Sequence, residues 1–295
     1  MMKNKFPALS LIILTAIVVF CFACGGLMTK DPLYMDLAHC NEAPGKEFLF
    51  GTDAMGRDIF SMIRYGGRIS ITIGFLATLL STVLAVLVGS VSGCAHARID
   101  GVLMGATELF LSVPGLLLTA FLQAVFGGAN VYSLSVVIGL TGWMSMAKVV
   151  RTEVLQLRHT DYVLAARCLG GGFFHVLFRH LAPNFFPSVL FVAVMNVRNA
   201  IVAESTLSFM GLGLPVEEVS WGSMLSLSEN ALLSRSWWII LIPGFFLVGT
   251  LLCLTNLGNY MRGNANRRHS NLGCEKNNKK NMIIMTTLSG NALAT

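Results

Sequence analysis

A short polar and basic insert between apolar segments is the part of this sequence best suited to bind another protein. It comprises Asp161–Gly170, DYVLAARCLG, and Arg179–Asn184, RHLAPN. Asp161 can cap the start of a helix here, and Gly170 can end it. Such a helix has one face made by the residues at i, i+3, i+4 and i+7, namely Tyr162, Ala165, Ala166 and Leu169. The pattern fits a docking helix, and it fits equally an amphipathic helix on a membrane surface.

A second group of candidate residues lies inside an apolar run. Arg198, Asn199 and Glu204 fall within Phe185–Met210, and ionisable groups inside a membrane segment are functional suspects. Arg198 and Glu204 are six residues apart, so on one helix they face different ways and cannot pair locally. Arg198 therefore needs another partner, either a ligand or a second polypeptide chain. If the protein is a transporter, all three residues are possible residues of its translocation path.

The sequence offers no catalytic chemistry of its own. It contains no G-x-x-x-x-G-K-[ST] stretch, the loop that cradles nucleotide phosphates. No nucleophile with a base and no clustered His/Asp/Glu set is visible within the apolar runs. His39 and Cys40 near Asp36 could touch a metal ion, but a plain loop is the favoured interpretation. We expect no catalytic residue, no metal site and no cofactor in this chain.

Composition identifies the class of protein that carries these residues. With 54% hydrophobic and 12% charged residues in a chain of 295, there are too few charges to cover a soluble globule. Apolar runs of about 20 residues can cross a bilayer as helices. Six such runs predict an all-α integral membrane protein with six transmembrane helices: Phe6–Met28, Ile69–Cys94, Val102–Phe126, Val131–Val149, Phe185–Met210 and Trp237–Tyr260.

The distribution of basic residues predicts the orientation, because cytoplasmic loops carry an excess of Lys and Arg. In a six-span arrangement one side receives Lys3, Lys5, Arg98, Lys148, Arg151, Arg158, Arg167, Arg179, Arg262, Arg267 and Arg268. That side should be the cytoplasm, with both chain termini on it. The net charge of +6 is then explained without a nucleic-acid partner.

The chain divides into four expected parts. Residues 1–28 form an N-terminal transmembrane helix, although a cleaved signal peptide is the alternative, and residues 29–68 form an extracytoplasmic segment. Residues 69–262 form a core of five transmembrane helices that contains the 161–184 loop. Residues 263–295 are polar and rich in Asn and Lys, which predicts a disordered cytoplasmic tail. Pro114 and Gly115 interrupt one span and predict a kink.

Several motifs in one order resemble a known family. Residues 50–58 read FGTDAMGRD and are similar to its GTDxxGRD signature, and Tyr162–Gly170 with Arg179, His180, Pro183 and Asn184 resembles its EAA loop. Further matches to its ExxLSFLGLG, SWG and PG motifs lie at Glu204–Gly213, Ser220–Gly222 and Pro243-Gly244. The family is that of ABC transporter permeases for dipeptides, oligopeptides and nickel, with a type I importer fold. Leu164 departs from it, because a glutamate is usual there.

The resemblance implies a function for the insert and a set of partners. Tyr162, Ala165, Ala166, Leu169 and Gly170 would form a cytoplasmic coupling helix that docks on an ATPase. The expected partners are two ATPase subunits that bind ATP and Mg, a second homologous permease, an extracytoplasmic solute-binding protein and membrane lipid, in a bacterial or archaeal inner membrane. The expected cargo is a di- or oligopeptide; a nickel or other metal chelate is the alternative, and a secondary transporter is a remote one.

The outer GTDxxGRD-like motif has a less specific role. Asp53, Arg57 and Asp58 could pair with one another in an ordered turn at the outer membrane surface. We favour a staple within the loop over direct contact with cargo.

Overall fold

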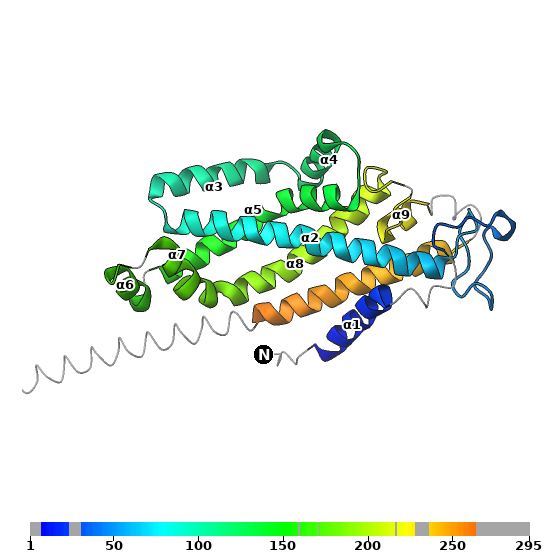
Figure 1. Ribbon diagram of the computed structural model, residues 1–295, viewed down its shortest axis with the longest axis horizontal. Coiled ribbons are helices and arrows are strands. Elements are labelled where there is room, and N and C mark those ends of the chain that lie inside the picture. Colours follow the sequence, from blue (N-terminus) through cyan, green and yellow to red (C-terminus); the bar gives the residue numbers. More distant parts are fainter. Residues whose placement is uncertain are drawn as a thin grey trace, which may run out of the picture.

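The computed structural model of the chain describes residues 7–23, 31–158, 160–170, 172–215, 217–227 and 236–263. In these residues the regular structure is helical, apart from one isolated bridge between Thr52 and Asp58. Four helices are long and apolar enough to cross a membrane: α2 (Ile59–Cys94), α5 (Val131–Leu157), α8 (Ala182–Phe209) and the last described helix (Trp238–Gly263). They run roughly lengthwise through the molecule in Figure 1, where the last described helix is orange. The all-α membrane architecture is confirmed.

The expected number of six spans is not confirmed. The first helix, α1 (Ala8–Phe22), has 15 residues, fewer than the about 20 that a straight crossing of the hydrocarbon layer requires. Counting the bent pair described below as one span gives five helical crossings at most among the described residues. The expected tail 263–295 lies outside the described residues, apart from Gly263.

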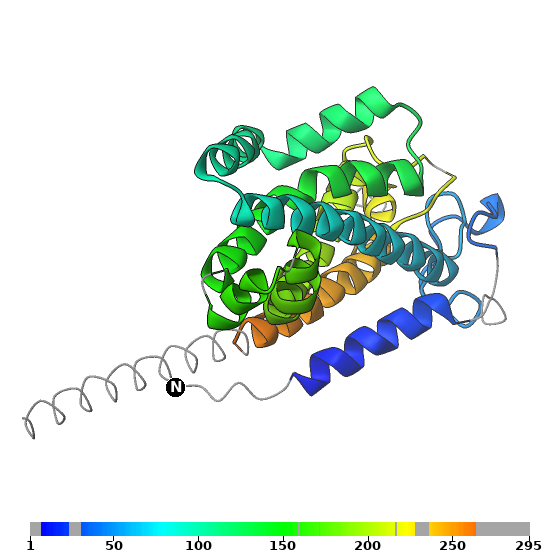
Figure 2. The same cartoon turned by 60° about the vertical axis from the view of Figure 1, so that its left-hand side comes forward.

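The run Val102–Phe126 is not one continuous helix. It is divided into α3 (Ala97–Ser112) and α4 (Gly115–Phe126), whose axes differ by 91°. Pro114 causes the break, because the residue before a proline avoids the helical conformation and Val113 accordingly has φ −82° and ψ 132°. Figures 1 and 2 show α3 and α4 on one side of α2 and α5, with α1 on the other side.

The helix α2 is the central element and is longer than predicted. It begins at Ile59, within the expected outer segment, rather than at Ile69. Its 36 residues extend over about 54 Å at 1.5 Å per residue. Asp58 caps its start by accepting a hydrogen bond from the Ser61 amide at 3.1 Å. Close packing against α5 depends on small residues: a Cβ added at Gly89 would lie 2.6 Å from the Ala147 carbonyl oxygen.

Short helices follow α5 at one end of the bundle, which we call the α6 end. They are α6 (Asp161–Cys168) and α7 (Phe173–Val176), and a π-helical turn (Leu177–Leu181) leads from them into α8. Buried apolar side chains from this region, Val163, Val176, Leu177 and Leu181, pack with Val150 and Val154 of α5. The segment 31–58 and the short helix α9 (Trp221–Ser226) lie toward the opposite end, which we call the outer end (Figure 1).

Candidate functional site

The α6 helix has an inner face that seats it on the bundle. Val163 is 0% exposed, and Ala166 packs partly buried against the same apolar cluster. The spacing of three residues puts both side chains on one face of the helix. The structure therefore turns Ala166 inward, toward this cluster, rather than toward an approaching partner.

The outer face of α6 is apolar and uncovered. Leu169 is 89% exposed, Leu164 is 45% exposed and Ala165 is exposed between them. Gly170 follows with φ +83°, a left-handed conformation that glycine adopts without strain. The side chain of Tyr162 lies outside the described residues. Ala165, Leu169 and Gly170 thus lie where a docking partner could reach them, with Leu164 adding apolar surface where the resemblance led us to expect a glutamate.

Glu204 lies at the outer end in a closed cluster of hydroxyl groups. It is 0% exposed, and its Oε1 accepts hydrogen bonds from Ser220 at 2.6 Å and Ser208 at 3.0 Å. Its Oε2 accepts from Ser70 at 3.0 Å and Ser205 at 3.3 Å. Both carboxylate oxygens therefore accept two hydroxyls each, which satisfies a buried carboxylate without a cation.

The hydroxyl cluster joins three helices. Ser70 belongs to α2, Ser205 and Ser208 belong to α8, and Ser220 caps α9. The backbone N–H of Trp221 also donates to Ser70 Oγ at 3.3 Å, and its indole Nε1 donates to the Ile63 carbonyl at 3.0 Å. Glu204 thus anchors α9 to the bundle, and cargo could reach the carboxylate only if this cluster opened.

Arg198 is more accessible than Glu204. Its guanidinium donates to Asn199 Oδ1 at 2.8 Å and to Thr255 Oγ1, on the last described helix, at 3.5 Å. Both acceptors are neutral, so these bonds leave the charge of Arg198 uncompensated. Asn199 is exposed beside it. The two residues lie close enough to act together on a ligand, and the pathway role of Arg198, Asn199 and Glu204 stays a prediction.

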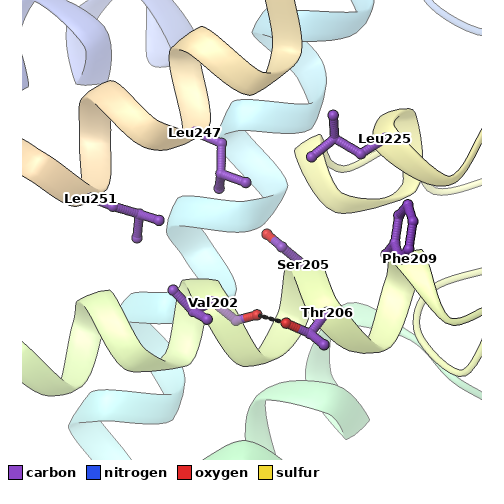
Figure 3. Close-up of a pocket in the computed structure, with 7 residues that line it drawn as sticks. All are labelled: Val202, Ser205, Thr206, Phe209, Leu225, Leu247 and Leu251. Carbon is purple, nitrogen blue, oxygen red and sulfur yellow. Dashed lines mark hydrogen bonds between the residues drawn. The ribbon is translucent and has the colours of Figure 1, made fainter. Parts of the chain in front are cut away.

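A groove opens between α8, α9 and the last described helix. Its volume is about 240 Å³, and Figure 3 shows the side chains that line it: Val202, Ser205, Thr206, Phe209, Leu225, Leu247 and Leu251. Thr206 donates to the Val202 carbonyl at 2.7 Å, within its own helix, so only Ser205 joins the groove to the Glu204 cluster. The groove is apolar and adjoins the hydroxyl cluster.

The outer motif is held together by a buried salt bridge. Arg57 binds Asp53 through Nε and Nη2, each at 2.7 Å from Oδ2, as the sequence suggested. Asp58 does not join this pair and instead caps α2, its Oδ2 lying 2.7 Å from Ser61 Oγ. The Trp238 indole Nε1 donates to the Thr52 carbonyl at 3.2 Å. The motif therefore ties the segment 31–58 to α2 and to the last described helix.

The sequence analysis did not consider Glu108, a charged residue within an apolar run, and used Lys148 only to predict the orientation. Glu108 of α3 and Lys148 of α5 form an ion pair at 3.1 Å, and Asp100 and Arg151 form a second pair between the same helices. A search for charges in Val102–Phe126 would have found Glu108, but its partner depends on packing. The described residues contain no group of three or more His, Cys, Asp or Glu side chains that could hold a metal ion.

Comparison with known proteins places this geometry in a family. OppC of Bacillus subtilis, an oligopeptide transport system permease protein, is 35% identical over 87% of this chain and 82% of its own length. DppC of the same organism, a dipeptide transport system permease protein, is 34% identical over 87% of this chain and 80% of its own. The MetNI methionine ABC transporter in an inward-facing conformation shares the fold, with a TM-score of 0.57 over 68% of this chain and 95% of that chain at 15% identity. Residues 85–268 match the family described as binding-protein-dependent transport system inner membrane component, and the chain belongs to that family.

Proposed function

We propose that the chain is one of two permease subunits of an ATP-driven importer that carries di- or oligopeptides across a bacterial or archaeal inner membrane. The second permease, two ATPase subunits that bind ATP and Mg, and an extracytoplasmic solute-binding protein complete the machine. The names of the two Bacillus relatives support peptides as cargo.

The observation that carries the proposal is the uncovered apolar face of α6. A side chain such as Leu169, 89% exposed at the end of a membrane bundle, is unfavourable in water. In the proposed machine an ATPase subunit covers this face, so the α6 end faces the cytoplasm. Closure of the ATPases on ATP would push on α6, and rigid movement of the attached helices would alternate access to the path.

The cargo path in this proposal includes Arg198 and Asn199. A guanidinium with two neutral acceptors can bind a carboxylate strongly and would repel a bare metal cation. This chemistry favours a peptide over a nickel ion as cargo.

The test is purification of the tagged chain in mild detergent together with whatever remains bound, followed by mass spectrometry and reconstitution in liposomes. We expect two ATPases and a second permease, and uptake of peptide that needs ATP and the binding protein. Uptake of a nickel chelate instead of peptide would show that the cargo assignment is wrong, while leaving the proposed machine in place. Active transport by the chain alone, without ATP, would make it a secondary transporter and overturn the proposal.

A substitution on α6 tests the docking face directly. Ala165→Asp puts a charge on the uncovered face, and we expect at least a tenfold loss of bound ATPase while the chain still inserts in the membrane. Ala97→Asp is the matched control, because Ala97 is an exposed alanine of α3 near the same end of the bundle. Equal ATPase recovery from both variants would contradict docking on α6.

A further inference from the structure

Two arginines at the end of α5 tie neighbouring helices together: Arg151 lies in its last two turns and Arg158 directly follows the helix. Arg151 donates from Nε and Nη2 to the two oxygens of Asp100, near the start of α3, each at 2.5 Å. Ser92 of α2 donates to the same carboxylate. Arg158 donates from Nη1 to the Gly93 carbonyl of α2 at 3.0 Å. The α6 end of α5 is thus bound to the end of α2 and the start of α3.

The helix α3 has few other contacts to hold it. Thr107 is its one buried residue in the structure, and its hydroxyl donates to the Leu103 carbonyl of the same helix. Apolar side chains such as Val102 and Leu109 point outward, each 73% exposed. The Glu108–Lys148 pair is exposed and makes a single contact at 3.1 Å, a type of pair that contributes little. Asp100–Arg151 is therefore the strongest polar link between α3 and α5 in the described part of the chain.

The docking helix follows this stretch of α5 through a short backbone link, in which the Thr160 N–H donates to the Leu157 carbonyl and the Val163 N–H donates to the Thr160 carbonyl, each at 3.0 Å. Val163 of α6 packs in one buried cluster with Val150 and Val154, and these two residues flank Arg151 in sequence. Any displacement of α6 therefore acts on the turn of α5 that holds Asp100. The two-point contact between guanidinium and carboxylate restrains the direction as well as the distance of α3 relative to α5.

We propose that the Asp100–Arg151 pair is the joint that passes movement of α6 to α3. The inference rests on the proposed function, in which an ATPase moves α6. Without the joint, α5 and α6 would still respond to ATP, and α4 would follow α5 through its own contact between Thr119 and Thr141, but α3 would not follow. Asp100 and Arg151 are positioning residues in this scheme and do not contact cargo.

The experiment compares ATP hydrolysis with uptake in the complete reconstituted transporter. For Asp100→Asn and for Arg151→Gln we expect ATP hydrolysis within about threefold of the unsubstituted complex and at least a tenfold fall in peptide imported per ATP. The double variant should be no worse than either single one, because each already removes the joint. Arg151→Lys keeps the charge but loses the two-point contact, so its peptide import per ATP should lie between that of the unsubstituted complex and that of Arg151→Gln.

The matched control is the other ion pair between the same helices. Glu108→Gln and Lys148→Gln should leave the import per ATP within about twofold. If Asp100→Asn does not fold, Ser92→Ala and Arg151→Lys still test the joint, and we expect a twofold to fivefold loss from each.

The outcomes separate the two proposals. ATP-independent uptake by the unsubstituted chain would overturn the proposed function and the joint with it. ATP-driven uptake in the unsubstituted complex, with an unchanged import per ATP in both Asp100→Asn and Arg151→Gln, would overturn the joint alone.

Discussion

At the scale of single residues, Glu204 has a packing role that its sequence position did not suggest, and its pathway role stays a prediction. An isolated carboxylate in an apolar run predicts a functional group, but four serine hydroxyls occupy its oxygens. Those serines come from positions as far apart as Ser70 and Ser220, so local spacing could not identify them. The carboxylate fixes α9 and, through Ser205, one wall of the groove.

Removing this carboxylate should destabilise the outer end of the bundle. Glu204→Ala leaves the buried hydroxyls without their acceptor, at a cost of about 2–4 kcal/mol in the free energy of unfolding. Glu204→Gln should cost less, because its amide oxygen still accepts. Thermal unfolding in detergent measures both, with Ser205→Ala as the mild control. An unchanged midpoint for Glu204→Ala would mean that the cluster does not hold α9.

At the scale of helices, packing depends on where the backbones come close. Gly89 and Gly93 of α2 lie against Val150 and Val154 of α5, and small residues at such contacts let membrane helices approach. Val150 and Val154 also belong to the buried cluster that contains Val163 of α6, so the glycines help to position the cluster against which the docking helix packs. Hydropathy alone predicts the helices but not this register.

Replacing two helical glycines by alanine should affect the stability of the protein differently. Gly89→Ala puts a Cβ 2.6 Å from the Ala147 carbonyl, and the resulting overpacking should cost about 1–3 kcal/mol of stability. Gly105→Ala on α3 meets nothing within 4 Å and should be neutral or stabilising by up to about 1 kcal/mol. Unfolding midpoints of the two variants provide the measurement. A loss of stability for Gly105→Ala equal to that for Gly89→Ala would contradict this account of the α2–α5 contact.

At the scale of the molecule, the sequence predicted the all-α membrane class and the family well, because these depend on local hydropathy and short motifs. The break at Pro114 was predicted as a kink, but its 91° angle depends on how α3 and α4 pack against α5. The inward turn of Ala166 was missed for a similar reason, since a helical face does not say which side meets the core. Pairs of residues far apart in the sequence, such as Asp100 and Arg151, can be identified only once the fold is known.

The path for cargo in the proposed machine lies between two permeases, so its test belongs to the whole assembly. Arg198→Gln removes the cation that would meet a peptide carboxylate, and we expect at least a fivefold loss of uptake for peptides with a free C-terminus. Peptides with an amidated C-terminus should lose much less, because they offer no terminal carboxylate to the guanidinium. Uptake is measured at saturating binding protein and peptide, with Thr255→Ala as the control that removes only a neutral partner of Arg198. Equal uptake by Arg198→Gln and the unsubstituted transporter would remove Arg198 from the path, and its charge would then serve contact with the second permease.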